Sequence, residues 1–292
     1  MSDHPPAIPD AEPRAHNLQC MEIWGGHGAV YDAVSAPGMD AWVFSRPYED
    51  GERGGDVHYL SGCASGRILR VAVADVAGHG ETVSETARAL RRLMRKSINT
   101  PDQSRLAREV NDAFEGESDV GLFATAILGT YWAPDRAFLF VNAGHPRPLL
   151  SRAGEAWVAL DADSPHVVRR KGEGGITNLP LGVIPRTEYE QLCVRLNVGD
   201  RLLLYTDFAI EARSPAGTEL GEDGLLALLN ERDHDDQDLI PRLMERIAEH
   251  AGGESPRDDA TLVLLRHNDS PIRYGIGERF RTLARLIGLA PV

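Results

Sequence analysis

The chain contains little of what disulfide-stabilised or membrane-bound proteins require. Its three cysteines, Cys20, Cys63 and Cys193, are too few and too widely spaced for a disulfide framework or a zinc site. No segment approaches the roughly 18 consecutive apolar residues of a membrane-spanning helix, and the N-terminus has no apolar signal core. We therefore predict a cytoplasmic protein in a reducing compartment, with no membrane partner.

Basic residues are also in the minority. Against 44 Asp and Glu there are 31 Lys and Arg, which gives a formal net charge of −13. No basic run is long enough to follow a phosphate backbone, so we expect no nucleic-acid partner. An acidic chain can still bind metal cations. With 292 residues the chain can bury roughly three quarters of its unfolded surface, enough for a full core.

Strand and helix patterns alternate along most of the chain. Short strand patterns paired by turn residues indicate several antiparallel hairpins. Apolar residues at helical spacing indicate amphipathic helices over residues 83–98, 103–114, 222–230 and 239–250. Many antiparallel strands with helices gathered in pairs predict the α+β class, with a sheet-on-sheet core flanked by helices.

Three segments differ from this pattern. Residues 1–17 are polar and rich in proline, and we expect a disordered segment there. Residues 161–175 are polar and glycine-rich, which indicates a loop or flap. Residues 269–292 include apolar residues at helical spacing with arginines between them. We expect this tail to be helical and to pack on the domain or on a partner.

Asp75 lies where a buried strand meets a turn. The apolar run 71–74 precedes it, Gly78 and Gly80 allow a sharp turn, and Thr82 with Glu85 has the spacing of a capping box that begins a helix. Rigid elements would therefore hold the Asp75 carboxylate from both sides. Such a place suits a metal ligand or a catalytic group, and it equally suits an ordinary turn aspartate.

Three further aspartates stand at predicted strand ends. Asp56 begins a strand whose hairpin partner ends at Asp75, Asp207 follows the strand 201–205, and Asp258 precedes a terminal strand. Unpaired carboxylates that converge would repel one another unless cations neutralised them. Oxygen ligands without Cys or His favour Mg²⁺ or Mn²⁺, and two such ions can activate a hydroxide for attack on a phosphoryl group. The alternative is that each acid caps a helix or turn separately.

Six short motifs occur in order along the chain. They are Gly54-Gly55-Asp56, Asp75-Val76-Ala77-Gly78-His79-Gly80, Asn142-Ala143-Gly144-His145-Pro146, Leu179-Pro180-Leu181-Gly182, Gly199-Asp200 with Tyr205-Thr206-Asp207, and Asp258-Asp259-Ala260-Thr261. This set resembles the SpoIIE-type branch of the metal-dependent, type 2C-like protein serine/threonine phosphatases. The resemblance implies a four-layer α-β-β-α fold, in which an antiparallel β-sandwich lies between helix pairs, and it makes residues 18–268 the phosphatase domain.

The resemblance also implies a metal site with two Mn²⁺ or Mg²⁺ ions. Asp75 would bridge both ions and so act in catalysis. The Val76 carbonyl and Asp56 would hold the second ion, and Asp207 and Asp258 the first. The implied substrates are phosphoserine or phosphothreonine proteins in bacterial signal transduction, including anti-sigma-factor antagonists.

Other motif residues receive secondary roles. His79 is a candidate general acid for the leaving alkoxide, with a packing or supporting role as its alternative. Asp259 stands where the wider family often has asparagine, and we give it a supporting role. The remaining residues expected to support the site are Gly55, Gly78 and His145.

The chain departs from the family pattern at two places. Phe208 follows Asp207 where the family usually has glycine, and a required positive φ there would strain a bulky residue. His58 and Tyr59 replace a common aromatic residue and a second aspartate. Phe208 and the basic, apolar tail leave a catalytically degenerate binding module as one alternative, and a metal-dependent phosphodiesterase for small nucleotides is a further one. All the proposed metal carboxylates are present, so we favour an active enzyme. The segment before Asp56 is too short for a sensor domain, so we expect a regulatory protein to act through the helices or the tail.

Overall fold

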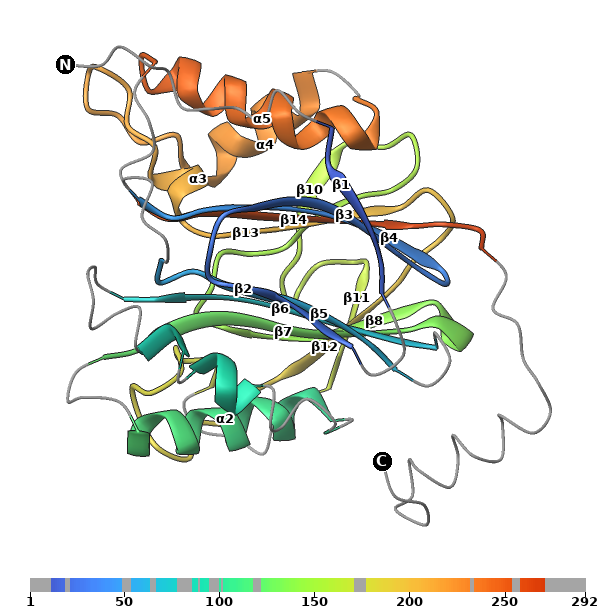
Figure 1. Ribbon diagram of the computed structural model, residues 1–292, viewed down its shortest axis with the longest axis vertical. Helices are drawn as coiled ribbons and strands as arrows, with labels where there is room; N and C mark the ends of the chain where they lie inside the picture. The colour runs from blue at the N-terminus through green and yellow to red at the C-terminus, as the bar shows by residue number, and fades with distance from the viewer. Residues whose placement is uncertain are drawn as a thin grey trace.

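The structure is a computed structural model. It describes residues 12–18, 22–48, 54–63, 67–77, 86–88, 90–94, 100, 102–117, 122–170, 177–231, 234–253 and 258–270. Two seven-stranded sheets stack face to face, and helices cover the outer face of each (Figure 1). The predicted α+β class and the four-layer arrangement are confirmed.

The first sheet contains strands from both ends of the described chain. In spatial order they are β1 (Arg14–Asn17), β3 (Val30–Ala36), β4 (Met39–Arg46), β14 (Ala260–His267), β13 (Arg201–Tyr205), β9 (Leu149–Ser151) and β10 (Trp157–Ala159). All neighbouring pairs are antiparallel except β1 with β3. The central strands β13 and β14 are therefore adjacent in space, although about 50 residues separate them in the sequence.

The second sheet is antiparallel throughout. Its spatial order is β11 (Val167–Arg170), β12 (Gln191–Arg195), β8 (Ala137–Ala143), β7 (Ala124–Trp132), β6 (Ile68–Val76), β5 (Val57–Cys63) and β2 (Ile23–Gly26). A short 3₁₀ helix, η2 (Ala133–Asp135), turns β7 into β8. The hairpin predicted between Asp56 and Asp75 forms as β5 and β6, with Val57 opposite Ala74.

Helices form the two outer layers. The first sheet carries α3 (Phe208–Glu211), α4 (Gly221–Glu231) and α5 (Asp236–His250), and the second carries α2 (Gln103–Glu117) (Figure 1). Residues 86–88 and 90–94 are also helical, and their side chains pack with α2 on the second sheet. Among the described residues, none of the helices has both the length and the apolar character that crossing a membrane requires.

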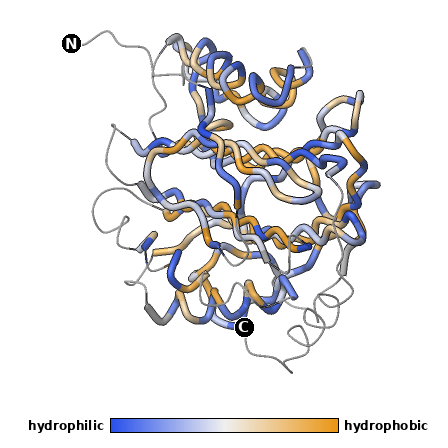
Figure 2. The backbone as a smooth tube through the Cα atoms, turned by 45° about the vertical axis from the view of Figure 1, so that its right-hand side comes forward, coloured by the Kyte–Doolittle hydropathy of each residue, from blue (hydrophilic) through white to orange (hydrophobic). Residues whose placement is uncertain are grey.

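Apolar side chains form three buried layers. One lies between the sheets and includes Val43, Val73 and Phe140. The others lie between each sheet and its helices, around Phe114 for the second sheet and Leu264 for the first. Because both faces of the central strands are buried, these strands are apolar at nearly every position rather than alternating. Figure 2 shows the hydrophobic colouring concentrated along both sheets and on the inner sides of the helices.

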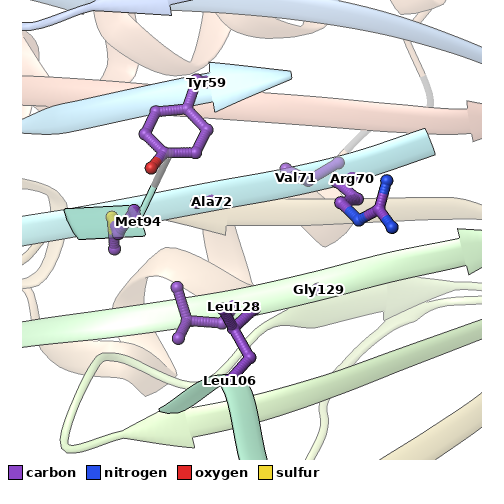
Figure 3. A pocket seen from close by; sticks show the side chains of 8 residues that line it. All are labelled: Tyr59, Arg70, Val71, Ala72, Met94, Leu106, Leu128 and Gly129. Carbon is purple, nitrogen blue, oxygen red and sulfur yellow. The ribbon is translucent and has the colours of Figure 1, made fainter. Parts of the chain in front are cut away.

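A small cavity lies beneath the helices of the second sheet (Figure 3). Its lining residues are Tyr59, Arg70, Val71, Ala72, Met94, Leu106, Leu128 and Gly129. A volume of about 10 Å³ holds at most one water molecule. The cavity is therefore too small to be a substrate site, and the functional site has to be sought elsewhere.

Two segments expected to lack regular structure contain strands, and a third predicted element is not described. Residues 14–17 belong to the segment expected to be disordered, but they form β1, because parallel pairing with β3 and an Arg14–Asp32 ion pair of 3.1 Å hold them. Residues 167–170 lie in the expected loop 161–175 but form β11, which pairs with β12. The predicted C-terminal helix falls on residues 271–292, which lie outside the described residues.

Pro241 lies inside α5 and leaves one helical carbonyl without its usual donor. Proline has no N–H, so the Gln237 carbonyl cannot receive the bond from four residues later. The hydroxyl of Tyr31 on β3 donates to this carbonyl at 3.2 Å. A side chain of the first sheet thus replaces the missing helical hydrogen bond.

We expect Tyr31→Phe to lower the free energy of unfolding by about 1 kcal/mol, the usual net value of one such bond. The control is the same substitution in a Pro241→Ala background. There the backbone N–H of the introduced alanine can satisfy the Gln237 carbonyl, so the loss should be clearly smaller. Urea denaturation of the four proteins measures both effects, and equal losses in the two backgrounds would contradict the assignment.

Candidate metal centre

The four strand-end aspartates lie at corresponding ends of the two sheets. Asp56 directly precedes β5, and Asp75 is the penultimate residue of β6, opposite Thr125 of β7. Asp207 follows β13 after one residue, and Asp258 lies two residues before β14, with Tyr205 opposite Leu262. Antiparallel pairing therefore brings the end of one strand beside the start of the next in both sheets.

A hydrogen bond joins these two sheet ends directly. The Thr206 hydroxyl, from the first sheet, donates to Oδ2 of Asp56 at 2.8 Å. The same hydroxyl oxygen accepts the Thr261 N–H at 3.0 Å, and the Thr261 hydroxyl lies 3.0 Å from that of Ser45. All four side chains are buried. Asp56 belongs to the second sheet, yet hydroxyl groups of the first sheet hold it.

Burial and neighbouring charges raise the pKa values of the carboxyl groups at this end. The pKa of Asp56 is raised well above its usual value, first by burial and then by the charge of Asp75, although the hydroxyls of Thr261 and Thr206 oppose the shift. Burial, followed by the charges of Asp207 and Asp258, raises the pKa of Asp75 to about 7. The carboxylates of the two sheets thus repel one another across the end of the sandwich.

Asp207 has a similar environment. Its pKa is raised to about 6, first by burial and then by the carboxylates of Glu211 and Asp258. Glu211 is the last residue of α3 and also raises the pKa of Asp75. Sequence analysis did not single out Glu211, because only the short turn of α3 brings it back toward Asp207.

The donor groups at this end fit a hard divalent cation. They are carboxylates whose mutual repulsion a cation would relieve, with Asp56 buried, Asp75 and Asp207 partly buried, and Asp258 exposed. Oxygen ligands are those that Mg²⁺ and Mn²⁺ prefer. Within the described part of the chain, no three His, Cys, Asp or Glu side chains converge closely enough to share one ion. The carboxylates lie near enough to raise one another's pKa values without meeting at a single point.

Phe208 fits its position without backbone strain. It begins α3, Asp207 before it has φ −65° and ψ −19°, and Phe208 is not among the described residues with positive φ. Its ring is 3% exposed and packs in the core layer that includes Leu225 and Leu229. The strain considered from the sequence is therefore absent, since this position is helical and does not need the freedom of glycine.

His145 is a buried, neutral side chain next to the site. Its Nδ1 lies 2.7 Å from the hydroxyl of Thr125, the residue opposite Asp75. Its backbone N–H donates to Oδ1 of Asn142 at 2.7 Å, and Asn142 Nδ2 donates to its carbonyl at 2.8 Å. Burial lowers the pKa of His145 to about 3. The supporting role expected for His145 stays a prediction.

The other expected site residues fall into two groups. Val76 ends β6 and is buried, and the Gly55 N–H donates to the Asp259 carboxylate at 2.5 Å. Gly78 and His79 lie outside the described residues. The roles proposed for those two residues therefore stay predictions.

Thr206 and Thr261 belong to two of the six sequence motifs, but no role was predicted for their buried hydroxyls. Their place in these motifs, within three residues of a predicted metal ligand, is the signal that could have marked them. We expect Thr206→Val to lower the free energy of unfolding by about 1–3 kcal/mol, because Asp56 and the Thr261 N–H both lose a buried partner.

The matched control for this prediction is Thr130→Val on β7. The Thr130 hydroxyl is buried and has no hydrogen-bond partner among the described residues. Its removal should be neutral or stabilising. Thermal and urea unfolding measure both variants, and equal losses at the two threonines would show that the Thr206 contact has no special importance.

Solved structures of other proteins share this fold. The PP2C phosphatase domain of the cell fate determinant SpoIIE from Bacillus subtilis, solved with a fragment of its regulatory domain, has 19% sequence identity and a TM-score of 0.64, covering 79% of this chain and 64% of that chain. RsbX, solved in complex with magnesium, has 16% identity and a TM-score of 0.58, covering 82% of this chain and 100% of that chain. The fold is that of the PP2C-type phosphatases.

The amino-acid sequence assigns the chain to one family with this fold. The model of the stage II sporulation protein E (SpoIIE) family matches residues 65–268. The chain belongs to this family of PP2C-like serine phosphatases. Among curated proteins, Protein IcfG of Synechocystis sp. (strain ATCC 27184 / PCC 6803 / Kazusa) is 22% identical over 162 residues, which cover 55% of this chain. The match spans only 23% of that relative's length.

Proposed function

We propose that the protein hydrolyses phosphoserine or phosphothreonine in a bacterial regulatory protein, with two Mn²⁺ or Mg²⁺ ions as cofactors. The observation that carries this proposal is the mutual repulsion of buried carboxylates from both sheets at one end of the sandwich. Membership of a phosphatase family and the likeness to a magnesium-bound relative support it. An anti-sigma-factor antagonist is the substrate class that the family resemblance suggests.

The chain's own carboxylates would hold the ions. Asp75 would contact both, Asp56 and the Val76 carbonyl would contact the second, and Asp207 and Asp258 would contact the first. These side chains would have to draw together around the ions, because no three carboxylates among the described residues meet at one point. When bound, the ions would supply Lewis-acid activation of water and neutralise phosphoryl charge. Thr206 would keep the Asp56 carboxylate oriented, and His145, neutral and hydrogen-bonded beside Thr125, would keep the loop after β8 in place.

His79 would donate the proton that the leaving alkoxide requires, or else would support the glycine turn after Asp75. The two roles predict different effects of removing His79 on the turnover of different substrates. A general acid matters most for a poor leaving group such as a serine alkoxide and little for p-nitrophenolate. His79→Ala should therefore reduce turnover of a phosphoserine peptide much more than that of p-nitrophenyl phosphate if it acts as the acid.

The test of the proposed function is hydrolysis of p-nitrophenyl phosphate and of a phosphoserine peptide, with Mn²⁺, Mg²⁺ or EDTA. We expect hydrolysis of both substrates with either ion and none with EDTA. A screen of cyclic nucleotides and other small phosphodiesters separates the phosphodiesterase alternative. Activity that EDTA leaves unchanged would refute a metal-dependent mechanism.

The degenerate binding module loses one of its two motivations. That alternative arose from Phe208 and from the basic, apolar C-terminal tail, and the helical geometry at Asp207 and Phe208 accommodates the Phe208 side chain without strain. Regulation by a separate protein, acting on the helices or on the C-terminal tail, remains part of the proposal.

A further inference from the structure

We propose that Asp259 is a positioning residue that holds Asp56 in place. It does so by accepting hydrogen bonds from both ends of the connection between β4 and β5. Oδ1 of Asp259 accepts the Tyr48 N–H at 2.6 Å, and Oδ2 accepts the Gly55 N–H at 2.5 Å. Tyr48 lies two residues after β4, and Gly55 directly precedes Asp56. The inference rests on the proposed function only in treating Asp56 as a metal ligand.

Gly54 shows how closely the Asp259 carboxylate approaches the backbone. A Cβ atom at position 54 would lie 2.4 Å from Oδ1 and 2.5 Å from Oδ2 of Asp259. The Gly54 N–H donates to the His27 carbonyl at 2.9 Å, so the backbone cannot easily move away. Any side chain at position 54 would displace the carboxylate, which explains why glycine precedes Gly55 and Asp56 here.

The contact links the two sheets. Asp259 directly precedes β14, whose Ala260 pairs with Arg46 of β4 in the first sheet, whereas Asp56 directly precedes β5 in the second. The Asp259 N–H also donates to Oδ1 of Asp258 at 2.8 Å. Asp259 thus orients one proposed ligand on each sheet, Asp258 through its backbone and Asp56 through its side chain.

A carboxylate is required for this arrangement. It offers an acceptor oxygen to each of the two N–H groups, whereas an asparagine amide offers one oxygen and turns an NH₂ donor toward the other N–H. The asparagine that is common at this position in the wider family could therefore satisfy only one of the two donors. In this chain the carboxylate holds both ends of the connection.

The experiment compares Asp259→Asn with Asp200→Asn. Asp200 is the control, because its buried carboxylate also accepts two backbone N–H groups, from Ala153 at 3.1 Å and Asn197 at 2.8 Å, away from the candidate site. It forms an ion pair with Arg152 in addition. Mn²⁺ affinity is measured by isothermal titration calorimetry, and amide hydrogen exchange of Tyr48 and Gly55 is measured by NMR in EDTA.

We expect Asp259→Asn to weaken Mn²⁺ binding by about 10-fold or more, as for other changes that disorient a metal ligand. In the metal-free protein, amide hydrogen exchange at Gly55 or Tyr48 should become faster by a similar factor. Asp200→Asn should reduce thermal stability and leave both quantities unchanged. If Asp259→Asn does not fold, Gly54→Ala is the second variant, and it should show the same two changes.

Three results would overturn the inference: unchanged Mn²⁺ affinity in a folded Asp259→Asn protein, equal weakening in Asp200→Asn, or unchanged exchange at Tyr48 and Gly55. Failure of the proposed function gives a different result. In that case the unsubstituted protein itself does not bind Mn²⁺, and the exchange measurement in EDTA decides whether Asp259 holds the connection.

Discussion

Replacing Asp75 by asparagine should reduce Mn²⁺-dependent hydrolysis of p-nitrophenyl phosphate by at least about 100-fold, since the proposed bridge between the ions loses its charge. The same change should stabilise the metal-free protein by roughly 1–3 kcal/mol, because a buried carboxylate beside like charges is removed. A functional loss together with a gain in stability is typical of a residue kept for chemistry rather than for folding.

The measurements are steady-state rates with Mn²⁺ and urea unfolding in EDTA near pH 8. Asp32→Asn is the control, because Asp32 is also a largely buried aspartate of the sandwich but pairs with Arg14. That variant should lose stability and keep its activity. An Asp75→Asn protein that is less stable than the unsubstituted protein, or that keeps its Mn²⁺-dependent rate, would contradict the site.

The stability gained by Asp75→Asn should depend on pH in a definite direction. In the folded protein the pKa of Asp75 is raised from 3.8 to about 7, so between these values the folded state binds more protons than the unfolded state. The contribution of Asp75 to stability is therefore fully present below about pH 4 and is lost as the pH rises through about 7. The advantage of the variant should grow over this interval, by a few kcal/mol in order of magnitude, and then level off.

Only the difference between the two proteins is diagnostic. The buried histidines His58 and His145 have pKa values lowered to about 3, and they make the stability of both proteins rise with pH up to about 6.5. Subtraction removes this common contribution. Thermal unfolding in EDTA at several values between pH 5 and 8 gives the difference, and a constant or falling advantage of Asp75→Asn would disprove the assignment.

Added Mn²⁺ should reverse the order of the two proteins. Protons compete with the metal for Asp75 and Asp207, so stabilisation of the unsubstituted protein by Mn²⁺ should increase as the pH rises from 6 to 8. Asp75→Asn should gain little from Mn²⁺ at any pH. Equal stabilisation of the two proteins by Mn²⁺ would place the binding site elsewhere.

Local patterns were sufficient for the overall architecture. The hairpin from Asp56 to Asp75 and the strands around Asp207 and Asp258 were predicted because strand periodicity and turn residues lie within a few positions of each acid. The family followed from the order of the motifs, and the family match confirms it. β1, β2 and β11 were missed because each is a four-residue strand at the edge of its sheet, and the strand that pairs with it lies elsewhere in the chain. The strand β3 was not predicted either.

The sequence by itself determined the fold class, the family and the position of each aspartate at the end of a strand, since these depend on short segments of chain. Only the tertiary structure decided how the acids are held. The bond from Thr206 to Asp56 spans 150 residues, and the bond from Tyr48 to Asp259 spans 211. The first contact forms only when the two sheets stack, and the second only when β4 and β14 pair. No local pattern specifies which threonine or carboxylate will meet which strand end.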